Sequence, residues 1–183
     1  MRPTFLELQS FSVEALDALL ARNSGPNPDN VAGYLYRGLA LKMPAPAFSL
    51  LGKFGKAFVK DGAGLRGWNV RMQQNALDDA WRPVEFKGKP VTYGHYRTRP
   101  TAPSERHPQA MTIDYALGGN RRLDPSSRIV DYLVAVGGDD LLLGRLYLNL
   151  GGRLIPMPSY FVLQRYLPVT ATVSPPCPPR AST

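Results

Sequence analysis

The stretch that most limits the possible folds of this chain is residues 129–149, which read IVDYLVAVGGDDLLLGRLYLN. Two apolar runs flank the sequence Gly-Gly-Asp-Asp at residues 137–140. Valine, leucine and tyrosine favour β-strands, and glycine and aspartate tolerate the positive φ angles of a tight turn. In the second run, leucine and glycine alternate with polar residues, as expected for a strand with one buried face. The stretch therefore predicts a β-hairpin.

Similar runs recur about every ten residues along most of the chain. The 17 glycines and 18 prolines fall mostly between them, which indicates many short elements. Pro83 should restrict its run to the edge of a sheet, since proline cannot donate to a strand ladder. The remaining runs that we expect to form strands are 31–41, 54–60, 65–72, 81–87, 91–99, 110–117, 153–157 and 159–167.

One amphipathic helix is expected near the N-terminus. Ser12 is a favourable N-cap, and Glu14 lies in the first turn, where the helix dipole stabilises negative charge. An apolar stripe follows and ends before the Asn-Ser-Gly-Pro sequence at 23–26. A second, shorter helical turn is expected at 48–51.

Eight to ten strands joined by short loops predict an all-β fold, a single up-and-down antiparallel barrel. Closure removes exposed edges, and about eight strands enclose room for one small ligand. A β-sandwich is the alternative. We expect residues 1–167 to form one domain and the proline-rich segment 168–183 to be a flexible tail.

The composition excludes some classes of protein. The single cysteine, Cys177, rules out an internal disulfide and a cysteine-rich zinc site. The sequence contains neither a leader-like N-terminus nor an apolar run of membrane-spanning length, so we expect a cytoplasmic protein. The formal charge is +8, but the longest basic run is Arg121-Arg122, so the basic residues are scattered. A basic surface for nucleic acid or an anionic membrane is a third functional hypothesis.

Four short segments, in order, suggest a family. These are 33–38 (GYLYRG), 51–58 (LGKFGKAF), 131–133 (DYL) and 139–144 (DDLLLG). Their order, after an N-terminal helix, resembles the bacterial lipocalin-like proteins with a GxWxG signature. Here Tyr36 replaces the tryptophan, one extra residue follows the first glycine, and the aspartate segment lacks the His-Phe-Arg continuation. The resemblance covers about residues 13–167. It implies a small lipocalin-like barrel for an apolar ligand and transfers no catalytic residue.

The aromatic residues are the main indication of a ligand. A lumen lined with aromatic rings would suit an apolar molecule, with phenol hydroxyls and Arg37 or Arg145 orienting its polar end. The alternative is that the rings simply fill the core. The aromatic residues expected to line the lumen are Tyr34, Tyr36, Phe58, Trp68, Tyr93, Tyr115 and Phe161.

The two histidines offer little chemistry. His95 lies in a predicted strand and could contact the ligand, act as a proton shuttle or serve as a lone haem or metal ligand. A structural, hydrogen-bonded histidine is the alternative. We expect His107, which precedes a proline in a polar loop, to be solvated. The sequence predicts no metal site and no resident cofactor.

Two aspartates, Asp114 and Asp131, lie within apolar predicted strands. A desolvated carboxyl group has a raised pKa and can act as a general acid or base. Alternatively, Arg37 or Arg145 could pair with it, or it could face water. The absence of a known catalytic motif favours binding over catalysis.

The first functional hypothesis is therefore a carrier of a small hydrophobic molecule, lipid-like or aromatic, with carboxylate-bearing molecules among the candidates. An isomerase or cyclase using Asp114 or His95 as acid or base is the alternative.

Overall fold

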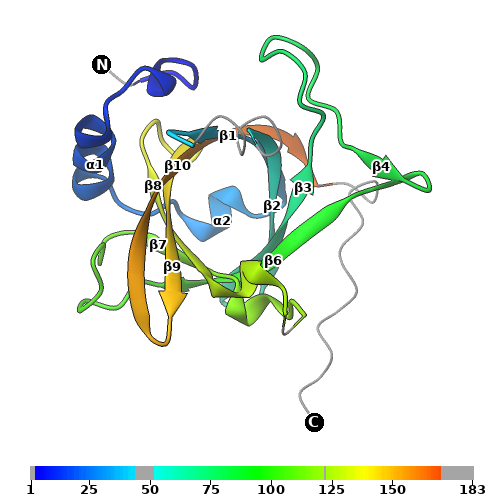
Figure 1. Cartoon of the computed structure of the whole chain (residues 1–183). Coiled ribbons are helices and arrows are strands. Elements are labelled where there is room, and N and C mark those ends of the chain that lie inside the picture. The colour runs from blue at the N-terminus through cyan, green and yellow to red at the C-terminus, as the bar shows by residue number, and fades with distance from the viewer. Residues whose placement is uncertain (1–2, 44–51, 122, 170–183) are drawn as a thin grey trace.

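The fold is a closed barrel of eight antiparallel strands (Figure 1). The computed structural model describes residues 3–43, 52–121 and 123–169. Each barrel strand pairs with the barrel strands before and after it in the chain, and the last pairs with the first, so the predicted up-and-down barrel is confirmed. The barrel strands are β1 (Tyr34–Leu41), β2 (Lys53–Asp61), β3 (Gly64–Arg71), β6 (Thr92–Pro100), β7 (Met111–Asp114), β8 (Ile129–Ala135), β9 (Leu141–Leu150) and β10 (Arg153–Pro168).

The predicted N-terminal helix is also confirmed. It is α1 (Val13–Arg22), and the Ser12 side chain caps it by accepting a hydrogen bond from the backbone N–H of Ala15. The helix predicted at 48–51 lies outside the described residues, as does the chain beyond residue 169. The other helical elements are α2 (Pro28–Val31) and the 3-10 helices η1 (Glu7–Gln9), η2 (Ala116–Gly118) and η3 (Pro125–Arg128).

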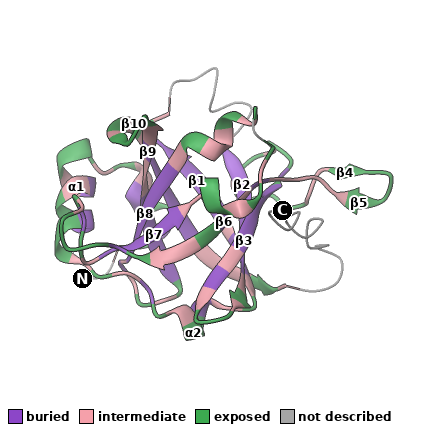
Figure 2. Cartoon of the chain, turned by 90° about the horizontal axis from the view of Figure 1, so that it is seen from below, coloured by how far each residue is buried: buried purple, intermediate pink, exposed green. Residues whose placement is uncertain are grey.

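The strand predicted at 81–87 is not part of the barrel. Only β4 (Glu85–Phe86) forms within it, pairing with β5 (Lys89–Pro90) in a small ribbon that projects from the barrel (Figure 2). The turn lies at Lys87 and Gly88, which both have positive φ, so it begins within the run that was predicted as a strand. Pro83 makes only an isolated bridge to Met72, the residue after β3, consistent with its missing N–H.

The separate strands predicted at 153–157 and 159–167 are instead one strand, β10. Its pairing with β9 shifts between Pro156 and Tyr160. Two prolines, at 156 and 158, lie at this irregularity and cannot donate to the ladder. The prolines therefore cause a bulge in the strand, where the sequence suggested a break.

Alternate residues of the strands belong to two separate apolar clusters. On β8, Leu133 belongs to the inner cluster, which also includes Val31 of α2, whereas Val130 and Val134 belong to the outer cluster. Because successive side chains of a strand point to opposite faces, one cluster faces the lumen and the other covers the barrel wall. The outer cluster includes Leu16 of α1, which lies against the wall (Figure 1).

Two of the inward-facing glycines lie under aromatic rings of the adjacent strand. A Cβ atom on Gly144 would come within 2.1 Å of the Phe161 ring, and Phe161 is its direct cross-strand partner. Gly38 is related to Phe54 in the same way. The missing side chains therefore make room for rings inside a narrow barrel.

We expect Gly144→Ala to destabilise the protein by about 1–3 kcal/mol, because the added methyl group overpacks the lumen against Phe161. Urea unfolding measures this cost. In a Phe161→Leu background the same substitution should cost less, because the ring that it would meet is gone. An equal cost in both backgrounds would show that the ring is not the obstacle.

Candidate functional site

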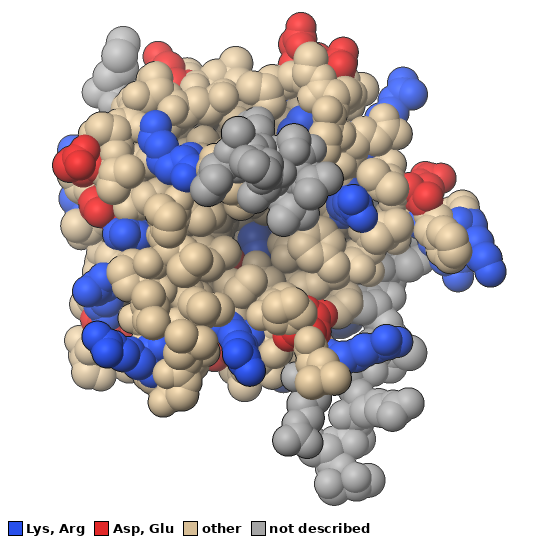
Figure 3. Space-filling model, viewed as in Figure 1, with Lys and Arg blue, Asp and Glu red and all other residues tan. Residues whose placement is uncertain are grey.

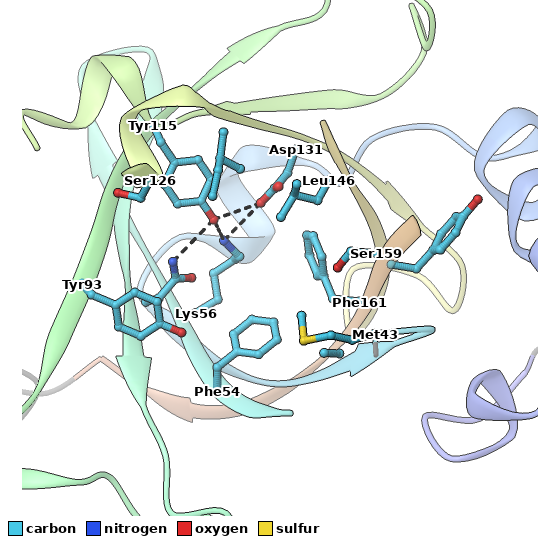
Figure 4. A pocket seen from close by; sticks show the side chains of 14 residues that line it. Met43, Phe54, Lys56, Tyr93, Tyr115, Ser126, Asp131, Leu146, Ser159 and Phe161 are labelled. Carbon is cyan, nitrogen blue, oxygen red and sulfur yellow. Dashed lines mark hydrogen bonds and ion pairs between the residues drawn. The ribbon is translucent and has the colours of Figure 1, made fainter. Parts of the chain in front are cut away.

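A cavity of about 150 Å³ occupies one half of the lumen. Figure 3 shows a hollow in this face of the molecule, with a basic side chain visible inside it. The other half, toward α2, is filled by Tyr36, Phe58 and neighbouring inner-cluster residues. The residues that line the cavity are Ala40, Met43, Phe54, Lys56, Asn69, Tyr93, Tyr115, Ser126, Ile129, Asp131, Leu146, Ser159, Tyr160 and Phe161 (Figure 4).

A buried polar cluster forms part of the cavity wall (Figure 4). The Lys56 Nζ donates a hydrogen bond of 2.7 Å to the Tyr115 hydroxyl, which donates one of 2.9 Å to Oδ2 of Asp131. The Lys56 Nζ also lies 3.6 Å from the same carboxylate oxygen. Both charged side chains are almost completely buried, with 1% and 2% of their side-chain surface exposed.

Strand register brings these residues together. Lys56 lies between Phe54 and Phe58 on the inward face of β2, directly opposite Asn69 on β3. Asp131 comes from β8, across the lumen (Figure 4).

A bulge in β6 adds a further polar contact. Pairing between β3 and β6 shifts at Gly94, whose φ is +54°. A Cβ atom there would come within 2.8 Å of the Asn69 Nδ2 and 3.1 Å of the Tyr115 ring. The glycine therefore supplies the backbone conformation and leaves room for both side chains. Its carbonyl oxygen accepts a hydrogen bond of 3.4 Å from Asn69.

Two oxygen atoms of the cluster lack a partner among the described residues. These are Oδ1 of Asp131 and Oδ1 of Asn69, both buried. The Asn69 amide orientation follows from the Gly94 carbonyl, which requires a donor. A buried acceptor without a hydrogen bond costs about 1–3 kcal/mol. Both residues line the cavity, so a bound molecule could supply the missing donors.

Aromatic rings surround the Lys56 amine. Its Nζ lies 4.5 Å from the centroid of the Tyr96 ring, 5.0 Å from that of Tyr115 and 5.5 Å from that of Phe161. Ring faces attract cations, more strongly where water is excluded. The rings thus partly stabilise the ammonium form of Lys56. They also keep water away from the amine, which disfavours the charged form.

Burial shifts the protonation equilibria of the pair toward the neutral forms. Desolvation lowers the pKa of Lys56 to about 8, although attraction to Asp131 opposes this shift. Desolvation likewise raises the pKa of Asp131, against the attraction of Lys56 and the hydrogen bond from Tyr115. Lys56 therefore becomes a neutral amine at a much lower pH than a solvated lysine.

The structure places some of the predicted ligand-binding residues at the cavity. Tyr93, Tyr115 and Phe161 line it. Tyr36 and Phe58 are in the inner cluster but at the filled end, and Tyr34 packs against the same cluster.

The remaining predicted ligand-binding residues lie elsewhere. Trp68 is in the outer cluster. Arg37 also lies outside the lumen, bound to Gln164 and stacked on Phe5. Arg145 holds α1 against the wall through an ion pair with Asp17. Neither arginine therefore pairs with Asp114 or Asp131.

Of the predicted acid–base residues, Asp131 lines the cavity, whereas Asp114 and His95 do not. Oδ1 of Asp114 accepts a hydrogen bond from the backbone N–H of Ala116, and its Oδ2 lies 4.0 Å from Nε of Arg99. His95 is half-buried, and desolvation lowers its pKa. His107, expected to be solvated, is instead buried, with its Nε2 2.8 Å from the Tyr147 hydroxyl, because its loop packs against the barrel wall.

Lys56 and Asn69 were not predicted as site residues. The available signal was a lysine between two phenylalanines of the same strand parity, Phe54 and Phe58. A basic residue on an otherwise aromatic face indicates a buried charge that needs a partner. Asp131, a carboxylate in an apolar strand, was the matching signal.

Comparison with models of known protein families and with curated protein sequences gives no match. In the described ranges, no helix has the length and apolarity needed to cross a membrane. Within the same residues, no three His, Cys, Asp or Glu side chains are grouped so that they could hold a metal ion.

We expect Asp131→Asn to lower the pKa of Lys56 further below 8, because the substitution removes the negative charge that favours the ammonium form. NMR of protein labelled with ¹³C-lysine follows the Lys56 Cε signal between pH 6 and pH 10. Asp61→Asn, which removes a surface partner of Arg97, is the matched control and should leave the midpoint unchanged. A midpoint that stays the same or rises in Asp131→Asn would contradict the pairing.

Proposed function

We propose that this protein binds a small, largely apolar organic molecule in the open half of its barrel. The observation that carries the proposal is the polar cluster on the wall of an otherwise apolar cavity, with two buried acceptors that lack partners among the described residues. Apolar pockets with a few convergent polar groups are typical of small-molecule sites. The walls would supply affinity and the cluster would orient the ligand.

The cavity volume limits the size of the bound group. About 150 Å³ equals the volume of an engineered protein cavity that holds benzene. This favours a single ring or a short branched chain over a haem or a retinoid. A larger molecule would have to extend out of the hollow seen in Figure 3.

The polar cluster favours a neutral hydrogen-bonding group on the ligand. A hydroxyl group could donate to the free oxygen of Asp131 or Asn69 and accept from Lys56. A carboxylate would approach the Asp131 carboxylate and meet repulsion in a medium of low dielectric constant. The proposed ligand is therefore an alcohol, phenol or carbonyl compound in preference to a fatty acid.

Benzyl alcohol tests this proposal. We expect it to bind more tightly than toluene, which lacks the hydroxyl group, and than benzoate, which is repelled. Isothermal titration calorimetry gives the affinities, and NMR of the labelled lysines reports whether the Lys56 signal moves.

Leu146→Trp provides the matching substitution, because Leu146 lines the cavity opposite Asp131 in the β8–β9 ladder. The larger side chain should weaken benzyl alcohol binding at least about tenfold, equivalent to about 1.4 kcal/mol. Leu150→Trp, at the exposed end of the same strand, should bind as the original protein does. Equal binding by both variants would place the ligand elsewhere, and no binding of any ring compound would refute the proposal.

A further inference from the structure

We propose that Lys56 binds its ligand covalently: its amine condenses reversibly with a small aldehyde held in the cavity and forms an imine. This inference rests on the proposed function and names a substrate class for the same site. It follows from the position of the amine, the groups around it and the contrast with another buried lysine of this chain.

Lys56 is the one amine among the described residues that line the cavity. Among the described residues, its Nζ makes a single hydrogen bond, to Tyr115, and the ion pair with Asp131 is long at 3.6 Å. An ammonium group can donate three hydrogen bonds. The amine is therefore incompletely bound on the side where a ligand would lie.

Lys53 shows what a structural buried lysine looks like in this protein. Its Nζ donates to Oδ1 of Asn75 at 2.5 Å and to the carbonyl oxygen of Ala76 at 2.8 Å. It also lies 4.5 Å from the centroid of the Trp81 ring, and it does not line the cavity. Lys53 thus makes two hydrogen bonds and a ring contact outside the cavity, whereas the Lys56 amine makes one hydrogen bond among the described residues and faces the cavity.

The surroundings of Lys56 also supply the proton transfers that imine formation needs. Asp131 accepts a proton from the ammonium group and leaves a neutral amine. The amine lone pair attacks the carbonyl carbon, and the C=O π bond breaks toward oxygen. The Tyr115 hydroxyl, which lies between the two charged groups, gives its proton to that oxygen and takes one from the attacking nitrogen. The result is a carbinolamine.

Loss of water then completes the reaction. The carbinolamine hydroxyl leaves as water with the proton held by Asp131, and the nitrogen lone pair forms the C=N bond. In sum, one ammonium and one aldehyde give one protonated imine and one water, with no oxidant or reductant. The protonated imine carries the same charge as the original ammonium, so the Asp131 carboxylate remains its counter-ion.

Benzaldehyde with sodium cyanoborohydride tests the inference, because reduction converts an imine into a stable benzyl amine. Intact-mass spectrometry counts the benzyl groups, and peptide mapping locates them. We expect Lys56 to be labelled before the exposed Lys60 and Lys87. An excess of benzyl alcohol should protect Lys56 but not the exposed lysines.

Two variants supply the controls. Lys56→Arg keeps a positive charge but has no nucleophilic amine. It should therefore lack the benzyl group whose attachment benzyl alcohol prevents. Lys53→Arg alters a buried lysine outside the cavity and should still acquire the benzyl group on Lys56. Circular dichroism spectra test whether both variants are folded.

The outcomes separate the two proposals. If benzyl alcohol binds in the cavity but Lys56 stays unlabelled while exposed lysines react, the imine is refuted and the proposed function stands. If neither benzyl alcohol nor benzaldehyde moves the Lys56 NMR signal, both proposals fall.

Discussion

The pairing of the first barrel strand with the last is the constraint on which the rest of the structure depends. All of β1 pairs with the second half of β10, from Tyr34 opposite Pro168 to Leu41 opposite Tyr160. This ladder closes the sheet, removes its edges and separates an inside from an outside. α1 and the N-terminal segment cover part of the outer face, so both sides of several strands are buried. A charged group placed on the inner face is thereby kept from water.

The polar cluster inside this barrel does not contribute to stability in a simple way. Burying an ion costs several kcal/mol, and replacing a buried ion pair by apolar side chains is often neutral or stabilising by about 1–4 kcal/mol. Lys56 and Asp131 have only a long ion pair and a shared tyrosine, and Asp131 keeps an unpartnered oxygen among the described residues. Buried polar and charged groups that reduce stability in this way are concentrated at functional sites. The energetic cost of the cluster therefore supports a role in binding.

Much of the fold could be predicted from the sequence, because strand alternation and turn residues are local signals. The hairpin at 129–149 and the capped helix after Ser12 are examples. The cavity was only partly predictable. Tyr93, Tyr115 and Phe161 were expected at the lumen, but Trp68 and Arg37 alternate onto the outer wall. Because both faces of these strands are apolar, parity alone does not say which face is inward.

Contacts between residues far apart in the sequence could not be predicted, because they depend on how the strands are aligned. The pairing of Lys56 with Asp131 depends on barrel closure and register, and the bulge at Gly94 sets where β6 places its tyrosines. The most direct test of the central claim is anomalous diffraction from crystals soaked in 4-bromobenzyl alcohol. We predict a bromine peak in the hollow, with the hydroxyl within hydrogen-bonding distance of Lys56, Asp131 or Asn69. Bromine bound only outside the barrel, with these side chains unchanged and no ligand in the cavity, would contradict it.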